Sequence, residues 1–512
     1  MVMEKWSEKK ANGRRLFTKL AALGAAAGII AINTLSGIPV MGAEKVKPNF
    51  LFILSDDHSV PHVGAYGDEN SLKFKITPHL DALAKESMVF TRAYTTAPQC
   101  APSRVSIFTG RSPIATRTSR FAQPVQKETL FFTDILKQNG YWVGLGGRGH
   151  HLHGRGLVRP HIKEQFEESE MFVDDRFDHI EVRRTSNQSL PKVPESFSAL
   201  LDKIPGNQPF FLYFGFSQPH RPWPKDISGI NPDELKLPPD WPDLPVVRED
   251  YARYLADLRD MDWAFGQIDS ILEARGLKDN TIVIFMGDNG EALLRGKGTL
   301  YTRGINVPLI VSWPDKIASH TTSDIMISGE DMAPTFLQMA GLKPNDEMTG
   351  VSFLPALLGE EMEARKFVFA ERSWQGGYLT RSDGFDLIRT VISKDYQFIY
   401  NVLPDRPYSP ADMGSVKDGS PDVWKRMQED QGGLSERHRK LFFQYPRPIV
   451  ELYDLKNDPF QMQNLAGHPE TKEVEKKLRI TLDKRIIREG DFVPIMDELR
   501  ELGGSAKRGI QD

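Results

Sequence analysis

Three short apolar runs, each ending in polar residues, constrain the fold of this chain more than any other feature. The runs and their ends are 49–54 followed by Ser55-Asp56-Asp57-His58, 210–216 followed by Ser217-Gln218-Pro219-His220, and 281–286 followed by Gly287-Asp288-Asn289-Gly290. Continuous apolar runs of this length are typical of strands buried on both faces of a parallel sheet. Because α/β sheets carry their sites at the carboxyl ends of the strands, we expect the polar clusters to meet at one edge.

Helical patterns separate these runs, which indicates an α/β fold. Apolar residues recur at three- and four-residue steps over 251–272, and Gly276 follows as a C-cap. Shorter patterns predict helices over 78–87 and 129–139. The segment 219–245 contains eight prolines, so we expect a long surface loop there rather than regular structure.

The pattern changes after about residue 360, where shorter segments predict a smaller α+β domain. Residues 386–391 and 396–400 are separated by a charged turn and predict a hairpin. Residues 451–454 predict a further strand, and 473–487 a closing helix.

Residues 1–43 have the layout of an export signal. Arg14 and Arg15 precede the uncharged apolar run 20–32, and Ala43 places a small residue before the expected cut. The paired arginines, followed by Leu16-Phe17-Thr18-Lys19, resemble a twin-arginine signal, which exports folded proteins. Thirteen apolar residues are few for a bilayer span, although a short uncut anchor is the alternative. We therefore expect a periplasmic or secreted protein without a stable membrane span, divided into an export signal (1–43), a catalytic domain (44–360) and a smaller C-terminal domain (361–512).

The charge of the chain argues against nucleic acid as a partner. Six of the 65 Lys and Arg and two of the 69 Asp and Glu lie in residues 1–43, so the remainder carries a formal charge of −8. An acidic protein lacks the basic surface that binds nucleic acid non-specifically. An anionic substrate would therefore need a local basic cluster.

The pairs Asp56-Asp57 and Asp288-Asn289 predict a metal site. Both offer hard oxygen donors at strand ends, which suit calcium or magnesium better than zinc. Either pair alone could simply cap a following helix. Two such pairs after similar buried strands favour the metal.

Cys100 is the only cysteine, which excludes an intramolecular disulfide and a thiolate zinc cluster. A lone cysteine is more often a small buried residue than a nucleophile. However, Cys100-Ala101-Pro102-Ser103-Arg104, followed by Val105-Ser106-Ile107-Phe108-Thr109-Gly110-Arg111, closely resembles the signature of the formylglycine-dependent sulfatases.

The resemblance extends over most of the chain after the export segment. Further segments similar to sulfatase landmarks follow in the family's order: Ser55-Asp56-Asp57, Thr77-Pro78-His79-Leu80-Asp81, Pro219-His220, Gly287-Asp288-Asn289-Gly290, Gly296-Lys297-Gly298-Thr299 and Glu451-Leu452-Tyr453-Asp454. The resemblance implies an α/β fold with an alkaline-phosphatase-like three-layer domain around a large mixed sheet, plus the smaller C-terminal α+β domain.

The resemblance also implies how Cys100 would act. In that family a separate maturation enzyme oxidises the signature cysteine to formylglycine, whose hydrate is the working group. A sulfate ester shields its sulfur with charged oxygens, so a nucleophile needs a cation that neutralises this charge and lowers its own pKa. One hydroxyl of the hydrate can attack sulfur, and the second can expel sulfate as the aldehyde re-forms.

The remaining site residues follow from the same resemblance. Asp56, Asp57, Asp288 and Asn289 would bind Ca²⁺ or Mg²⁺, together with residue 100 and the substrate sulfate. Arg104 would hold the hydrate, and Lys297 would contact a sulfate oxygen. His150 matches the base of the elimination step and His220 the acid that protonates the leaving group. Without the other motifs, each histidine would be an ordinary surface or core residue.

Arg148 departs from the family pattern. Family members commonly have Gly-Lys-x-His where this chain has Gly147-Arg148-Gly149-His150. Arginine can bind two sulfate oxygens but cannot give up its proton, so we expect Arg148 to bind substrate rather than act as an acid. The adjacent His151 and His153 could shift the register of His150.

The resemblance implies a sulfated glycan as substrate. The segment 210–221, the helix before Asp288 and the hairpin before Glu451 resemble the heparan N-sulfatases, whereas 100–117 resembles the iduronate-2-sulfatases. Both families act on glycosaminoglycans, so N-sulfoglucosamine of heparan-type chains is the specific hypothesis, and N-sulfate versus O-sulfate stays open. A basic rim for this polyanion could come from five arginines, unless these are ordinary surface residues: Arg155, Arg159, Arg221, Arg295 and Arg303.

Two other functions remain open. One is a phosphonate or phosphodiester hydrolase of the same superfamily, because phosphoryl and sulfuryl groups share shape and in-line geometry. The other is a non-catalytic glycan-binding protein that has kept the fold.

Overall fold

The computed structural model describes most of the chain after the expected export segment. The described residues are 47–119, 125–148, 152, 164, 168, 176–182, 190–374, 385–411 and 422–496. They belong to one compact unit that begins at Lys47. The export signal predicted over 1–43 lies outside the described residues. Among the described helices, none combines the length and apolar character that a bilayer crossing requires.

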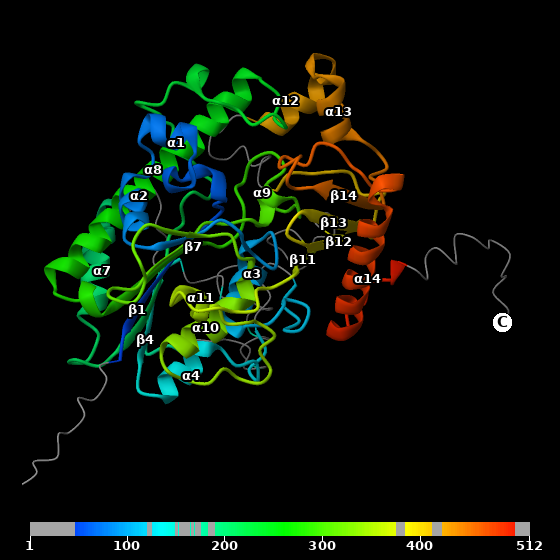
Figure 1. The fold of residues 1–512 in the computed structure, drawn as a ribbon. Helices are drawn as coiled ribbons and strands as arrows, with labels where there is room; N and C mark the ends of the chain where they lie inside the picture. The colour runs from blue at the N-terminus through cyan, green and yellow to red at the C-terminus, as the bar shows by residue number, and fades with distance from the viewer. Residues whose placement is uncertain are drawn as a thin grey trace, which may run out of the picture. The chain divides into compact units, whose positions relative to one another are not determined.

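An eight-stranded mixed sheet forms the centre of this unit (Figure 1). Its strands lie in the order β5-β4-β6-β1-β7-β8-β2-β9. The first five run parallel, β8 runs antiparallel to both β7 and β2, and β9 is parallel to β2. The bounds of the strands are β1 (Asn49–Ser55), β2 (Met88–Phe90), β4 (Trp142–Gly147), β5 (His179–Val182), β6 (Phe210–Gly215), β7 (Thr281–Gly287), β8 (Leu309–Ser312) and β9 (Thr321–Ser323).

The three predicted apolar strands are adjacent at the centre of this sheet. Strand β1 pairs with β6 on one side and β7 on the other, with Phe52 opposite Tyr213 and Ile284. Every residue of the three strands is buried. Alternate residues of β1 enter different cores, Leu51 on one face and Phe50 on the other. Burial on both faces explains why these strands read as continuous apolar runs.

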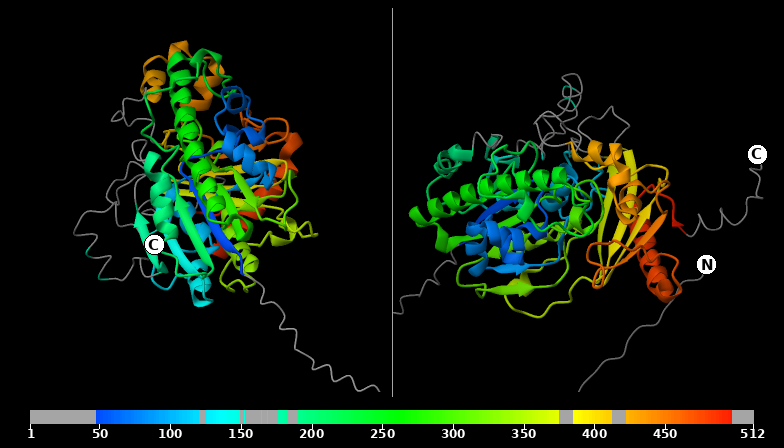
Figure 2. Two further views of the ribbon diagram at one scale, coloured as in Figure 1. Left: turned by 90° about the vertical axis from the view of Figure 1, so that its left-hand side faces the viewer. Right: turned by 90° about the horizontal axis from the view of Figure 1, so that it is seen from above.

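Helices cover both faces of the sheet, which confirms the predicted three-layer architecture (Figures 1 and 2). One face packs against α2 (Pro78–Lys85), α7 (Val193–Leu201) and α8 (Pro245–Ala274). The other packs against α3 (Cys100–Thr109), α4 (Phe132–Gln138), α10 (Met332–Met339) and α11 (Leu354–Leu357). Further helices among the described residues are α1 (Glu69–Phe74), α9 (Thr302–Ile305), α12 (Val423–Glu429) and α13 (Glu436–Phe443). Short 3-10 turns occupy Val60–His62, Gly64–Tyr66, Leu190–Lys192, Pro232–Glu234, Lys278–Asn280, Gly329–Asp331, Gln431–Gly433 and Pro469–Thr471.

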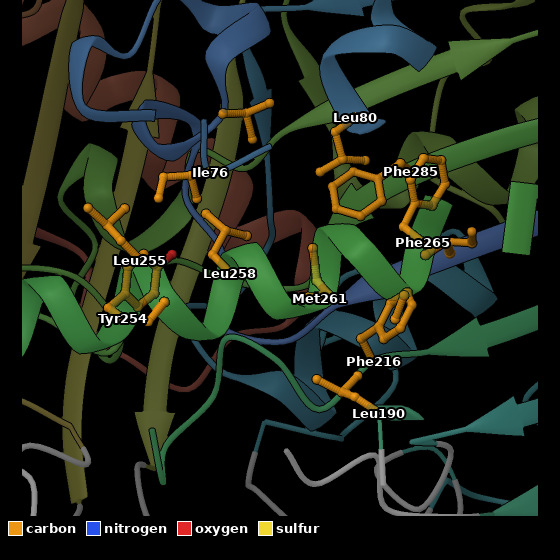
Figure 3. Close-up of a cluster of buried hydrophobic side chains, with 14 of the residues drawn as sticks. Ile76, Leu80, Leu190, Phe216, Tyr254, Leu255, Leu258, Met261, Phe265 and Phe285 are labelled. Carbon is orange, nitrogen blue, oxygen red and sulfur yellow. The ribbon is translucent and has the colours of Figure 1, made fainter. Parts of the chain in front are cut away.

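The long helix α8 supplies much of one core. It begins at Pro245, earlier than the predicted 251, because proline fits the first turn of a helix. Side chains one or two turns apart on α8, including Leu258, Met261 and Phe265, point together into the cluster shown in Figure 3. This spacing places them on a single face toward the sheet.

The proline-rich segment 219–245 differs from the surface loop predicted for it. Apart from one 3-10 turn, it contains no described helix or strand before α8. However, Trp223 and Trp241 are buried, and their indole nitrogens donate to the carbonyls of Pro219 and Leu294. Buried tryptophans with satisfied N–H groups make this segment part of the core rather than a loose covering.

A separate antiparallel sheet and a closing helix form the C-terminal region, as predicted. The elements are β11 (Val368–Trp374), β12 (Phe385–Ile392), β13 (Tyr396–Asn401), β14 (Val450–Asp454) and α14 (Lys472–Glu489). Helix α14 packs against β12 and β13 through a core that includes Leu478 and Leu482. A further two-stranded ladder joins β3 (Ala93–Tyr94) to β10 (Ile327–Ser328).

We predict that Ile268→Ala, on the buried face of α8, lowers the free energy of unfolding by ~2–5 kcal/mol, because it leaves a cavity in the core. Urea denaturation followed by tryptophan fluorescence measures this change. Ile487→Ala on α14 is the matched control, because Ile487 is 64% exposed and the same truncation there should cost less than ~0.5 kcal/mol. Equal losses at both positions would contradict the packing described for α8.

Candidate active site

The ends of the three central strands bring the predicted polar clusters together. Backbone hydrogen bonds join these ends directly: Asp56 N donates to Gln218 O at 3.0 Å, and Asp288 N donates to Ser55 O at 3.0 Å. His58 N donates to Asn289 O at 2.8 Å. Parallel strands in register therefore place these residues at one edge, although β1 and β7 lie more than 200 residues apart in sequence.

The four predicted metal ligands lie in one buried cluster. The side chain of Asp288 accepts a hydrogen bond from Asp57 N at 3.0 Å, and the amide of Asn289 donates to Asp57 Oδ1 at 2.8 Å. Asp57 has a left-handed φ of 65°, which is uncommon outside glycine and asparagine. The hydroxyl of Tyr254 on α8 donates to the Asp57 carbonyl at 3.2 Å and so supports this turn.

Cys100 lies at the first position of helix α3 and faces this cluster. Its Sγ is 3.2 Å from Asp56 Oδ1 and 3.9 Å from Asp57 Oδ1. Ligand atoms of Asp56, Asp57, Cys100 and His220 lie within 4.8 Å of one another. Burial, followed by the charge of Asp56, raises the pKa of the Cys100 thiol well above its usual value. The unmodified thiol therefore stays protonated and is a poor nucleophile.

Arg104, one turn along α3, connects the carboxylates. Its Nε donates to Asp288 Oδ2 at 2.9 Å and its second terminal nitrogen to Asp56 Oδ2 at 2.7 Å. Burial alone would raise the pKa of Asp56, but Arg148 and Arg104 outweigh it and hold that pKa well below its usual range. For Asp288, burial and the charge of Asp56 outweigh Arg104 and raise the pKa to about 6.

Two residues to which the sequence analysis assigned no role, Tyr213 and Ser103, contact Arg104 and Asp288. The hydroxyl of Tyr213 accepts a hydrogen bond from Arg104 at 2.7 Å and donates to the Arg148 carbonyl at 3.2 Å. The Ser103 hydroxyl donates to the Asp288 carbonyl at 2.5 Å. Tyr213 carries the only polar side chain of β6, and a phenol inside an apolar strand that leads to a site is the signal that could have identified it.

Lys297 and Arg148 supply further positive charge. The Nζ of Lys297 lies 2.9 Å from both carboxylate oxygens of Asp57. The Nε of Arg148 lies 2.9 Å from Asp56 Oδ2, and its side chain is largely buried. Both cations therefore offset part of the negative charge of the buried carboxylates.

His220 is partly exposed and faces the same cluster. Its Nε2 is 3.8 Å from Asp57 Oδ2, while its Nδ1 contacts the Arg221 carbonyl. Because a carbonyl only accepts, Nδ1 must carry a hydrogen, which leaves Nε2 as the atom that gains or loses a proton. The second predicted histidine, His150, lies outside the described residues, as do His151 and His153.

The cluster suits a hard divalent cation. The donors are carboxylate and amide oxygens, the ligand type of Ca²⁺ and Mg²⁺. Asn289 Oδ1 is buried and has no hydrogen-bond partner among the described residues, although buried polar atoms are normally paired. A cation bound by Asp56, Asp57, Asp288 and Asn289 would satisfy this oxygen.

Three of the arginines predicted to form a basic rim are instead held by contacts within the protein. Arg221 is buried, forms a two-pronged ion pair with Asp250 and stacks on Trp223. The guanidinium of Arg295 donates to the carbonyls of Phe460 and Gln461. Arg303 is largely buried and pairs with Glu291 and Asp240. Because these charges are already neutralised or enclosed, the rim prediction is wrong for all three, whereas Arg155 and Arg159 lie outside the described residues.

Comparison with known proteins finds sulfatases among the proteins similar to this chain. A family model described as "Sulfatase" matches residues 48–342, and a second, described as "N-sulphoglucosamine sulphohydrolase, C-terminal", matches residues 290–407. The chain is 29% identical over 434 residues to an ulvan-active sulfatase of Formosa agariphila, covering 84% of this chain and 78% of that protein. It is 27% identical over 485 residues to N-sulphoglucosamine sulphohydrolase of Homo sapiens, covering 87% and 91% of the two chains.

A solved structure extends the similarity to the fold. The phosphonate monoester hydrolase of Silicibacter pomeroyi superposes with a TM-score of 0.66 at 19% identity, over 87% of this chain and 96% of that chain. The sulfatase match alone spans more than half of the 512 residues, and it includes Cys100 together with all four oxygen-donor residues of the cluster. This chain therefore belongs to the sulfatase family, the hydrolases of sulfate esters.

Proposed function

We propose that this sulfatase removes sulfate groups from a sulfated glycan, and specifically the N-sulfate of glucosamine in heparan-type chains. The observation that carries the proposal is the buried cluster in which Asp56, Asp57, Asp288 and Asn289 surround the signature residue Cys100. Three cationic side chains, Arg104, Arg148 and Lys297, border the same cluster. This combination can hold both a divalent cation and a sulfate group.

Cys100 is proposed as the precursor of formylglycine, produced by a separate maturation enzyme. When bound, the cation would neutralise charge on the sulfate oxygens and lower the pKa of the attacking hydroxyl that the oxidised residue supplies. Arg104 is fixed by Asp56, Asp288 and Tyr213, so its guanidinium is oriented before substrate arrives. A fixed guanidinium orients the group at position 100 with little loss of side-chain entropy.

The other residues act on the substrate. Lys297 and Arg148 would bind sulfate oxygens, with Arg148 limited to binding because it keeps its proton. His220 would protonate the leaving nitrogen or oxygen through Nε2, since Nδ1 is held by the Arg221 carbonyl. His150 is proposed as the base that assists sulfate release.

The comparisons support a glycan substrate without distinguishing among glycans. The match to the C-terminal model of N-sulphoglucosamine sulphohydrolase favours an N-sulfate, whereas the ulvan-active relative favours a different glycan. The similarity to a phosphonate monoester hydrolase keeps that reaction as the second candidate.

We also propose export and a two-domain organisation. The arginine pair and apolar run of residues 1–43 support a periplasmic or secreted location. The start of the antiparallel sheet at Val368 supports a boundary near residue 360 between the catalytic and C-terminal domains.

We expect the matured protein to release sulfate from a heparin oligosaccharide that ends in N-sulfoglucosamine, faster than from its O-sulfated, N-acetylated counterpart. Ion chromatography of free sulfate measures both rates.

Mass spectrometry of the peptide containing residue 100 should show the aldehyde. The variant Cys100→Ala should lose activity about a thousandfold or more, because the nucleophile is gone. Faster turnover of an aryl phosphonate monoester than of any sulfate ester would support the second candidate instead.

A divalent cation should stabilise the folded protein. Calcium at ~100 times its dissociation constant should add about 2.7 kcal/mol to the free energy of unfolding of chelator-treated protein, because it binds only the folded cluster. A thermal melt with and without calcium measures this effect. Asn289→Ala should reduce it strongly, whereas Asn457→Ala, at an exposed turn, should leave it unchanged. A calcium response that is the same in both variants would exclude Asn289 as a ligand.

Tyr213→Phe should lower kcat/KM about ten- to a hundredfold, with most of the loss in kcat, because a hydrogen bond to the charged Arg104 is worth roughly 1.5–3 kcal/mol. Steady-state kinetics on an aryl sulfate would measure this loss, and thermal melting would check the fold. Tyr141→Phe is the matched control, since the Tyr141 hydroxyl is buried without a hydrogen-bond partner among the described residues. Wild-type kcat in Tyr213→Phe would show that Arg104 does not need this contact.

A further inference from the structure

A cavity of about 280 Å³ lies between the C-terminal sheet and helix α13, apart from the proposed catalytic cluster. Its walls come from β11, β12, β13 and β14, from α13, from Tyr408, and from the segments 299–301, 444–448 and 462–468. Neither Cys100 nor any of the four proposed metal ligands lines it. The volume approaches the lower end of the range typical of small-molecule sites.

The charge of the lining is strongly positive. Four cationic side chains line the cavity, Arg372, Arg437, Lys440 and Arg447, against a single carboxylate, Glu451. That carboxylate is already satisfied, because one oxygen accepts from the hydroxyls of Tyr301 and Tyr453 and the other accepts from the Asn401 amide. An anion entering the cavity would therefore meet more positive than negative charge.

Two of these cations are available to a ligand. Arg437 and Lys440 are exposed and lie three residues apart on α13, so they project from the same face of the helix. Neither has an ion pair or side-chain hydrogen bond within the part of the chain that the structure describes. By contrast, Arg447 is paired with Asp386, and Arg372 donates to the Gly298 carbonyl.

The remaining lining suits a sugar ring. The exposed amides of Gln444 and Gln463 can donate to and accept from hydroxyl groups. The rings of Tyr408 and Phe442, whose centroids are 5.8 Å apart, supply an apolar wall. A few polar groups around an aromatic wall are typical of small-ligand sites.

We propose that this cavity is a second carbohydrate site, which binds an anionic sugar residue through its carboxylate or sulfate group. The proposal rests on the proposed function in that it takes the ligand to be the same class of glycan. The two sites share one loop: Lys297 contacts Asp57 in the catalytic cluster, while Thr299 and Tyr301 line the cavity. A chain bound at the second site would be held next to the loop that carries Lys297.

The test compares two double variants of the full chain in a Cys100→Ala background, which prevents both maturation and turnover. Arg437→Gln/Lys440→Gln removes the two unpaired cations of the cavity. Arg426→Gln/Lys425→Gln removes the same charge from the neighbouring helix α12, outside the cavity lining. Isothermal titration calorimetry with a heparin hexasaccharide measures the dissociation constant, and thermal melting checks that both variants fold.

We expect the cavity variant to bind the hexasaccharide ~5- to 10-fold more weakly than the Cys100→Ala parent, and the α12 variant to bind like the parent. Equal affinities of the two double variants would overturn the proposal. A hyaluronan hexasaccharide, which carries carboxylates but no sulfate, identifies the recognised group: a similar loss indicates carboxylate recognition, whereas no binding indicates recognition of sulfate. Neutral chitohexaose tests whether charge is recognised at all. If it binds to the parent and to the cavity variant equally, and as tightly as heparin does, charge recognition is excluded.

The outcome is independent of the reaction. A wild-type protein that releases no sulfate from any glycan or aryl ester would defeat the proposed function, yet the cavity variant could still lose affinity. Conversely, an active sulfatase with unchanged binding in the cavity variant would retain the proposed function and remove only the second site.

Discussion

The burial of three carboxylates at one sheet edge is the constraint on which the rest of the site depends. Asp56, Asp57 and Asp288 are fully enclosed, and an unpaired buried charge costs several kcal/mol. Arg104 and Lys297 offset part of this cost through direct contacts of 2.7–2.9 Å. The fold must therefore hold cations and carboxylates in a fixed relation, and a divalent cation would offset the repulsion that remains.

The two cores on either side of the sheet provide that fixed relation. Alternate residues of β1 pack against different helix layers, so a shift of one residue would send Phe50 and Phe52 to the wrong face. The same register determines where Asp56 and Asp57 emerge beyond the strand. Packing of the apolar runs thus sets the positions of the polar ends, which explains why both appear together in the sequence.

This coupling also explains how much could be predicted from the sequence. The strands β1, β6 and β7 and their polar ends are local patterns, and so are the C-terminal hairpin and α14. The roles of Arg221, Arg295 and Arg303 could not be predicted, because their partners lie elsewhere in the chain. For example, Arg295 binds carbonyls at 460 and 461, more than 150 residues away. Tyr213 stands out as a phenol in an apolar strand, but its contact with Arg104 could not be predicted because that residue lies on another element.

The contacts of Arg295 show that the C-terminal region supports a loop of the proposed catalytic cluster. Gln461, whose carbonyl accepts from Arg295, also accepts from Thr302 N and donates to Gln397 on β13. Gln397 in turn donates to the Leu300 carbonyl at 2.6 Å. These bonds hold the loop 295–302 on both sides of Lys297, which contacts Asp57. Because the bonds are buried, losing the C-terminal sheet would leave their partners on the loop unsatisfied and allow Lys297 to move. The smaller sheet therefore supports the proposed active site structurally rather than being an appendage.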